Sequence, residues 1–370
     1  MAESYICAIG TALPPHRLSQ ATIAEFMIRA LALDEAAARR LRVLYRATGI
    51  DARHTVVPDY GRDPAGFTFY PPTTNLEPFP TVSQRMAAYR VAAVPLAVAA
   101  VHDCLTAVPA VTPASITHLI TVSCTGMYAP GLDIDLVSSL GLSNTVQRTA
   151  VNFMGCYAAF NGLKLADAMV RADPAARVLV VCVELCTLHF QKHQTDDHLL
   201  SNALFGDGAA ATLVTAAPVT AELPALALEA AHCALEPAGH AEMAWHIGDS
   251  GFEMTLSSYV PDLIRAGIGQ LTEGLLRALN LHLADITHLA VHPGGRRILE
   301  VIEQALGLPH AANRHAYAVL REYGNMSSVT VLFVLRRLLN ELTSANRGER
   351  VLSFAFGPGL TLESLLLRVA

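Results

Sequence analysis

The sequence lacks clusters of basic charge, and its share of charged residues is small. Charged residues make up 16% of the 370 residues and hydrophobic residues 52%. This balance excludes a disordered chain and can fill a large buried core. The formal net charge is −6 and no run of lysine and arginine occurs. We therefore expect no nucleic acid partner, and an acidic substrate would have to meet a local basic patch.

Paired cysteine motifs, metal motifs and long apolar runs are also missing. The seven cysteines are scattered, without a C-x-x-C pair, so the sequence predicts reduced thiols, no disulfide framework and no metal site. No nucleotide or flavin motif is present. The longest apolar run, Val91 to Val101, is too short to cross a bilayer, and the first residues lack the basic start of a signal peptide. We expect a cytoplasmic protein without membrane insertion.

What the chain does contain is an alternation of strand-like and helical patterns, which is typical of an α/β layered fold. The predicted strands are residues 5–9, 117–122, 147–152 and 177–183, and the predicted helices are 20–33, 35–46, 82–107, 131–140 and 156–171.

Several of these segments recur later in the chain. The pattern at 116–122 returns at 286–292, Gly155-Cys156 is matched by Gly324-Asn325, and 177–179 is matched by 350–352, each about 170 residues later. A fourth match, between 206–208 and 357–359, is about 20 residues closer and implies an insertion between Glu184 and Phe205. The sequence thus predicts two duplicated α/β halves, residues 1–220 and 221–370.

Cys156 stands where an apolar strand ends and a buried helix is predicted to begin. Free backbone N–H groups and the helix dipole at such a position favour a thiolate, so we expect a lowered pKa and a nucleophile. The alternative is a small core residue.

The duplication brings two further residues to the same place, because equivalent strand and helix ends converge across a pseudo-dyad. Asn325 is the counterpart of Cys156, and His292 ends a repeated strand before Pro293-Gly294-Gly295. His292 could pair with the cysteine as a thiolate, and His292 and Asn325 could both donate to an oxyanion. The alternatives are a core histidine and an ordinary helix cap. Papain-like hydrolases use the same three residue types in a water-accessible cleft. The apolar composition of this chain instead favours a reaction of an enolate carbon in a site without water.

Five motifs in order resemble those of type III polyketide synthases, the chalcone-synthase-like enzymes of the thiolase fold, and their bacterial members in particular. The motifs are Gly155-Cys156, 204–210, 292–295, 324–328 and 356–363, and the resemblance covers essentially the whole chain. It implies a layered α-β-α-β-α sandwich.

The resemblance also implies an acyltransferase that needs no cofactor and uses CoA thioesters as substrates. Cys156 would carry an acyl-CoA starter and the growing chain, while His292 and Asn325 would stabilise the enolate from malonyl-CoA. Cyclisation would release a resorcinol, a pyrone or a related aromatic polyketide. A homodimer is implied as well.

Other site residues follow from the same resemblance. Phe205 matches the gatekeeping aromatic between the CoA tunnel and the cavity. Met254 falls at a second gatekeeper position of the plant enzymes, where methionine gives a more flexible wall. Cys124 and His189 fall at cavity positions that hold threonine in plant members, although both could be plain core residues. These departures leave the starter open, with a fatty acyl chain as one candidate. Arg46 and Arg53 are candidate contacts to CoA phosphates, because guanidinium suits phosphate oxygens.

Two alternatives to iterative condensation remain. One is a single-round 3-ketoacyl synthase of fatty-acid synthesis, which shares the Cys, His and Asn set. The other is a catalytically inactive scaffold with the thiolase fold, a silent scaffold. Three further patterns are interpreted as structural only: 248–251, the pair His193 and Asp197, and the pair Cys182 and Cys186.

Overall fold

The computed structural model describes residues 3–220 and 223–370. Its centre is a nine-stranded mixed sheet in the order β11-β12-β13-β8-β1-β7-β6-β4-β5. The strands of the first half are β1 (Tyr5–Ala12), β4 (His118–Ser123), β5 (Gln147–Asn152), β6 (Val178–Leu185) and β7 (Asp207–Thr215). The strands of the second half are β8 (Leu226–Leu235), β11 (His288–Val291), β12 (Arg350–Gly357) and β13 (Thr361–Val369).

The strand order confirms the duplication. In the first half β4 lies parallel to β6, which is antiparallel to β7, which is antiparallel to β1. In the second half β11 lies parallel to β12, which is antiparallel to β13, which is antiparallel to β8. The two halves join where β1 pairs with β8. The predicted boundary between residues 220 and 221 adjoins two residues outside the described part of the chain, so it stays a prediction.

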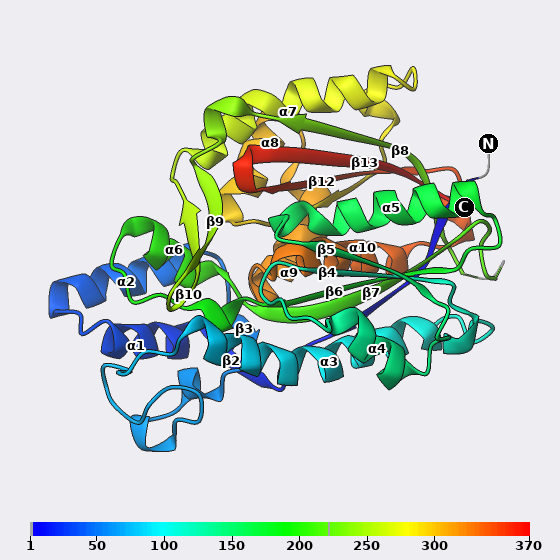
Figure 1. Ribbon diagram of the computed structural model, residues 1–370. Helices are drawn as coiled ribbons and strands as arrows, with labels where there is room; N and C mark the ends of the chain where they lie inside the picture. Colours follow the sequence, from blue (N-terminus) through cyan, green and yellow to red (C-terminus); the bar gives the residue numbers. More distant parts are fainter. Residues whose placement is uncertain (1–2, 221–222) are drawn as a thin grey trace.

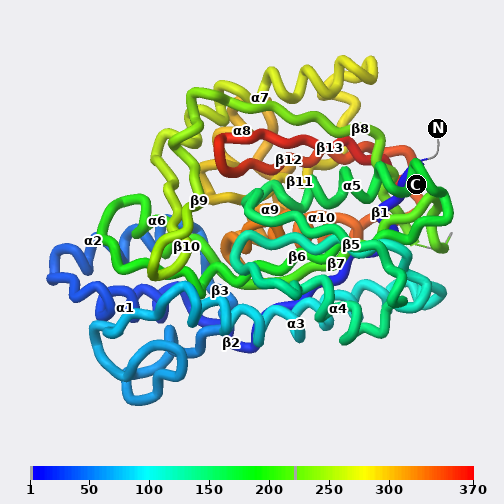
Figure 2. Tube along the Cα trace, viewed as in Figure 1, coloured from blue at the N-terminus to red at the C-terminus, as the bar shows by residue number. Residues whose placement is uncertain are grey.

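Helices cover both faces of each half and give the predicted five layers (Figure 1). The outer layers are α3 (Val82–Thr106) with α4 (Leu132–Leu140), and α7 (Val260–Arg277) with α8 (Arg296–Leu306). The central layer holds α5 (Ala158–Ala172) and α10 (Thr330–Glu341), beside α9 (Arg314–Tyr323). The tube in Figure 2 shows the two helix-covered halves meeting at this central layer.

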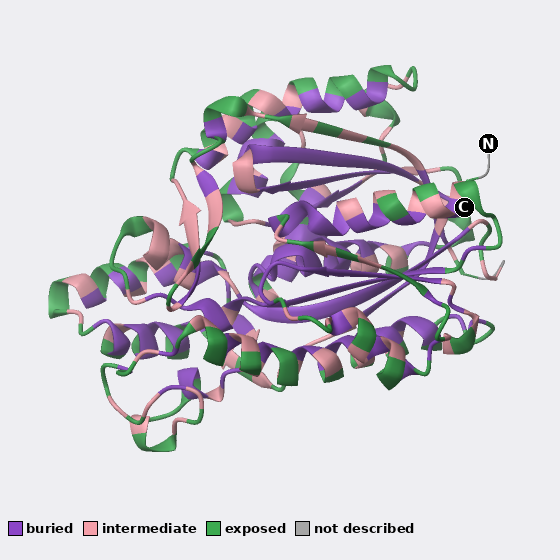
Figure 3. Cartoon of the chain, viewed as in Figure 1, coloured by how far each residue is buried: buried purple, intermediate pink, exposed green. Residues whose placement is uncertain are grey.

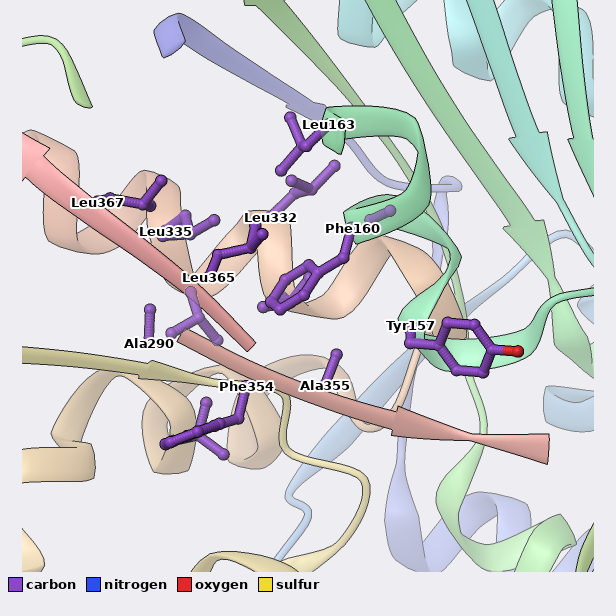
Figure 4. Packing of buried hydrophobic residues seen from close by; sticks show 14 of the residues in the cluster. Tyr157, Phe160, Leu163, Ala290, Leu332, Leu335, Phe354, Ala355, Leu365 and Leu367 are labelled. Carbon is purple, nitrogen blue, oxygen red and sulfur yellow. The ribbon is translucent and has the colours of Figure 1, made fainter. Parts of the chain in front are cut away.

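Burial on both sides explains the composition of the strands. Along β6, Leu179 and Val181 belong to the apolar cluster on the α3 side, while Val178 and Val180 belong to the cluster that includes α5. Because successive side chains alternate between faces, a strand covered on both sides is apolar throughout. Figure 3 shows these strands as buried. The helices outside them are buried on one side and exposed on the other. Figure 4 shows Phe160 and Leu163 of α5, Leu332 and Leu335 of α10 and Leu365 of β13 gathered in the central core.

The long helix α3 is apolar enough to cross a membrane by length and composition alone, a test that core helices also pass. It packs against β1, β7 and β6 in the structure, which accounts for its apolar residues as part of the core.

Several elements outside the duplicated core surround the site. Helices α1 (Gln20–Ala30) and α2 (Glu35–Ala47) match the predicted ranges within a few residues. A ribbon of β2 (His16–Ser19) and β3 (Ala52–Thr55) and a hairpin of β9 (Met243–Gly248) and β10 (Gly251–Leu256) were not predicted. The inserted segment before Phe205 contains α6 (Asp196–Leu204), which lies against β10.

Candidate active site

Two cavities meet at Cys156. The outer one, of about 370 Å³, is also lined by His292 and Asn325. The inner one, of about 60 Å³, extends to Cys124, His189 and the α1 residue Met27. The structure therefore brings together the three residues that the duplication predicted at one site.

Cys156 lies in a single turn of 3-10 helix, Gly155–Tyr157, and α5 begins only at Ala158. Gly155 adopts a left-handed φ of +77°, and a Cβ atom there would stand 2.3 Å from Cδ of Pro358. A Cβ on Gly357 would stand 2.5 Å from the Tyr157 ring. Residues 357–359, part of the last of the five motifs, thus pack directly on the turn that holds Cys156. This close packing requires glycine at positions 155 and 357.

The expected lowering of the Cys156 pKa is wrong. Burial raises the pKa to about 12, and hydrogen bonding by the side chains of Ser327 and Asn325 lowers it only in part. One short turn offers a weaker positive end than the long helix that the sequence suggested, and desolvation of the thiolate outweighs it.

His292 follows β11 and is 1% exposed. Its backbone N–H donates to the Phe354 carbonyl at 2.8 Å. Within the described part of the chain neither ring nitrogen has a hydrogen-bond partner, and burial lowers the pKa of the imidazole to about 3. Burial thus favours the neutral imidazole, which has one N–H available for a ligand.

Asn325 is held in one orientation by its own turn. Its Oδ1 accepts the Ser327 backbone N–H at 2.8 Å, and its Nδ2 donates to the Gly294 carbonyl at 3.2 Å. Since an amide nitrogen carries two hydrogens, one N–H of Nδ2 is left for the outer cavity. His292 and Asn325 together supply two neutral donors in a dry site.

Phe205 and Met254 each line both cavities. Phe205 caps the end of α6 and forms a β-bridge with Asn325, while Met254 comes from β10. Their position between the two cavities is the one expected of gatekeepers.

Arg53 was predicted to contact CoA, and the structure contradicts this. The side chain is 2% exposed, and its Nε donates to Gln20 Oε1 at 2.9 Å. Its Nη1 donates to the carbonyls of Asn202 and Phe205. Arg53 therefore supports the end of α6 and the backbone of the gate, a role that its sequence neighbours did not indicate.

We predict that Arg53→Met lowers the free energy of unfolding by roughly 2–4 kcal/mol, because one buried and two partly buried acceptors lose their donor. Urea unfolding of the variant beside the exposed control Arg39→Met measures this. An unchanged midpoint together with a raised KM for malonyl-CoA would restore the role in CoA binding.

Basic residues at the outer cavity lie elsewhere. Arg46 is exposed on the last turn of α2. The next two residues, Ala47 and Thr48, line the outer cavity. Arg296 and Arg297 line this cavity directly. Their position immediately after 292–295 was a signal that the sequence analysis missed.

Cys124 belongs to a buried polar cluster that the sequence analysis also missed. Its backbone N–H donates to Glu184 Oε2 at 3.0 Å, and its Sγ lies 3.2 Å from the Ser327 hydroxyl. Burial raises the pKa of the Glu184 carboxyl, which Ser328 and Thr125 also contact. A single glutamate inside the apolar strand β6 was the available signal.

His189 lies between two elements rather than free in the inner cavity. Its Nε2 contacts the Thr125 carbonyl at 2.7 Å, and its Nδ1 accepts the Phe252 N–H at 3.0 Å. Burial lowers its pKa to about 3. With both nitrogens engaged, His189 joins Phe252 of the β9–β10 hairpin to Thr125 of the first half.

The patterns interpreted as structural lie in three parts of the fold. Residues 248–251 form the turn of the β9–β10 hairpin, where Gly248 pairs with Gly251. Cys182 is buried inside β6. His193 lies close to His198 and Glu253.

Comparison with known families and proteins gives one consistent result. The family described as chalcone and stilbene synthases, N-terminal domain, matches residues 2–218, and the corresponding C-terminal domain matches residues 227–370. The alpha-pyrone synthesis polyketide synthase-like Pks18 of Mycobacterium tuberculosis is 32% identical over 96% of this chain and 88% of its own length. Type III polyketide synthase C of Arabidopsis thaliana is 32% identical over 99% of this chain and 95% of its own length.

Solved structures show the same similarity. PKS-I from the brown alga Ectocarpus siliculosus superposes with a TM-score of 0.91 and 31% identity, covering 100% of this chain and 98% of that one. The C-terminal type III polyketide synthase domain of Steely1 from Dictyostelium gives a TM-score of 0.90 and 27% identity, with 99% of both chains covered.

Proposed function

Because the chain belongs to the chalcone and stilbene synthase family, the type III polyketide synthases, we propose that it extends an acyl-CoA starter with malonyl-CoA by iterative decarboxylative Claisen condensation. The observation that carries this proposal is the convergence of Cys156, His292 and Asn325 on one outer cavity.

The first step loads the starter. The Cys156 thiol gives its proton to His292 while its sulfur attacks the starter thioester, and CoA leaves with that proton. Burial disfavours a free thiolate and a free imidazolium separately, so the two groups ionise together as a pair. The acyl group is then held as a thioester on Cys156.

The second step forms the carbon–carbon bond. Malonyl-CoA in the outer cavity loses CO2, and its thioester oxygen becomes an enolate that accepts N–H groups from His292 and Asn325. The enolate carbon attacks the acyl carbonyl and displaces the Cys156 sulfur, so the extended chain leaves on CoA and can be loaded again. The low exposure of all three residues keeps water from quenching the enolate.

We propose a starter with a flexible apolar chain, such as a fatty acyl group. The inner cavity is small and its lining surface is mostly apolar, with contributions from Phe190 and from Ile23 and Met27 of α1. Unbranched methylene chains suit such a surface. A pyrone is the favoured product, because the similar mycobacterial protein Pks18 is named for alpha-pyrone synthesis, and resorcinols are the competing outcome.

A panel of acyl-CoA starters incubated with malonyl-CoA and analysed by mass spectrometry tests this proposal. We expect products that contain the starter plus more than one two-carbon unit, formed from free CoA esters. A single extension that requires carrier-protein-bound substrate would instead support the 3-ketoacyl synthase reading. Absence of any product and of iodoacetamide labelling at Cys156 would support the silent scaffold.

We also propose a cytoplasmic homodimer. The edge strand β5 leaves its outer side unpaired in the sheet. Large apolar side chains are exposed on nearby elements, among them Val91, Ile134 and Met154. Such a surface suits a second copy of the chain, and sedimentation equilibrium tests it.

The arginines at the outer cavity are expected to bind the phosphates of CoA. We predict that Arg297→Ala and Arg46→Ala each raise the KM for malonyl-CoA about 5- to 10-fold with little change in kcat, since each removes a charge-assisted contact. Steady-state kinetics at two salt concentrations measures this, with Arg39→Ala as the exposed control. Unchanged KM values for both variants would contradict the assignment.

A further inference from the structure

The inserted segment and the β9–β10 hairpin bring two histidines and a glutamate to one point. His193 precedes α6, His198 lies in its first turn, and Glu253 belongs to β10. We propose that these three side chains bind a divalent transition metal ion such as zinc. The observations behind it do not depend on the condensation chemistry, and His198 also lines the inner cavity.

The geometry suits such an ion. One ligand atom from each residue lies within 4.8 Å of the other two. Ligands of a tetrahedral zinc ion stand about 3.4 Å apart at the usual bond lengths, so the three groups must close by roughly an ångström. His193 is exposed and can make this adjustment. Two imidazoles and one carboxylate form a ligand set that zinc accepts, with water as a fourth ligand.

The His198 ring is already oriented for metal binding. Its Nδ1 lies 2.6 Å from the Thr195 hydroxyl, and its Nε2 is buried with no hydrogen-bond partner among the described residues. When Nδ1 donates to Thr195, the lone pair of Nε2 is left free to bind an ion. Metal-binding histidines usually have their second nitrogen fixed by such a bond.

The local charge also favours a cation. Glu253 forms no ion pair or side-chain hydrogen bond within the described ranges, and the carboxylate of Asp197 acts on His198 from the same turn. The neighbouring Lys192 ammonium is turned away, since it binds Glu77 and the Asn75 carbonyl. Two carboxylates would balance a doubly charged ion.

Metal binding would join two elements that carry the gate. Phe205 directly follows α6, and Met254 directly follows Glu253 on β10. An ion held between α6 and β10 would therefore fix the spacing of the two side chains that lie between the cavities. The spacing of residues in the sequence did not predict this site, because Glu253 is far from the two histidines along the chain.

Zinc titration of the purified full-length protein, followed by calorimetry, tests the site. We expect one equivalent bound by the wild type, and an affinity at least ten-fold lower for His193→Ala and for Glu253→Gln. His102→Ala, an exposed histidine on α3, should bind as the wild type does. His193 is itself exposed, so its loss should leave the fold intact, and thermal unfolding without metal checks this.

Cobalt(II) in place of zinc identifies the ligands. The His193, His198 and Glu253 site predicts a cobalt spectrum without the charge-transfer band of a thiolate. In hydrogen exchange, one equivalent of zinc should slow exchange in α6 and β10 of the wild type but not of Glu253→Gln. Unchanged zinc affinity in both variants, or a thiolate band, would overturn the proposal.

Discussion

Cys156→Ala is expected to lower polyketide formation by at least about 1000-fold, because covalent capture of the acyl group is lost and no other group can replace it. The change removes one sulfur atom from a buried turn and leaves Gly155 and the packing of Pro358 in place. Product formation from an acyl-CoA and malonyl-CoA, followed by liquid chromatography with mass spectrometry, measures the effect.

Two cysteine variants control this experiment. Cys233 is exposed on β8, so Cys233→Ala should keep wild-type activity. Cys124 is buried beside Glu184, so Cys124→Ala separates a second cavity thiol from the nucleophile. If Cys156→Ala keeps a tenth or more of the activity, or if Cys124→Ala alone abolishes it, Cys156 is not the acyl carrier.

The second large effect concerns the enolate donors. Asn325→Asp replaces an N–H donor with a carboxylate at the site where negative charge develops, and we expect malonyl-CoA decarboxylation to fall by about 100- to 1000-fold. His292→Ala should cause a fall of similar size. Release of labelled CO2 measures this step without any need for product.

A matched variant separates chemistry from folding. His292→Gln keeps an N–H donor, so it should retain more decarboxylation than His292→Ala. Thermal unfolding should be close to the wild-type value for both, since the His292 ring makes no hydrogen bond within the described residues. Equal decarboxylation by His292→Ala, Asn325→Asp and the wild type would contradict the assignment of the two donors.

The duplication made most of the fold and the centre of the site predictable. The matches 155–156 with 324–325 and 116–122 with 286–292 placed Cys156, Asn325 and His292 at equivalent strand and helix ends. The structure places all three on one cavity. The alternation of strand-like and helical patterns and the internal matches were sufficient for the two α/β halves, whereas the five layers were implied by the family resemblance.

What the sequence could not predict depends on contacts between distant segments. Arg53 appeared as a free guanidinium because its acceptors, at Gln20, Asn202 and Phe205, are far from it along the chain. The pKa of Cys156 followed from the depth of burial, which a helix-start pattern does not report. The metal-binding cluster depends on the contact of α6 with β10.

The central claim is that Cys156 carries the starter and the growing chain. The most direct measurement is mass spectrometry of the peptide containing Cys156 after rapid acid quench of the protein with an acyl-CoA and malonyl-CoA. We predict that this peptide carries the starter acyl group alone and, after malonyl-CoA is added, the starter extended by successive two-carbon ketide units. An unmodified Cys156 peptide during active turnover, or an acyl group found on another cysteine, would contradict the account.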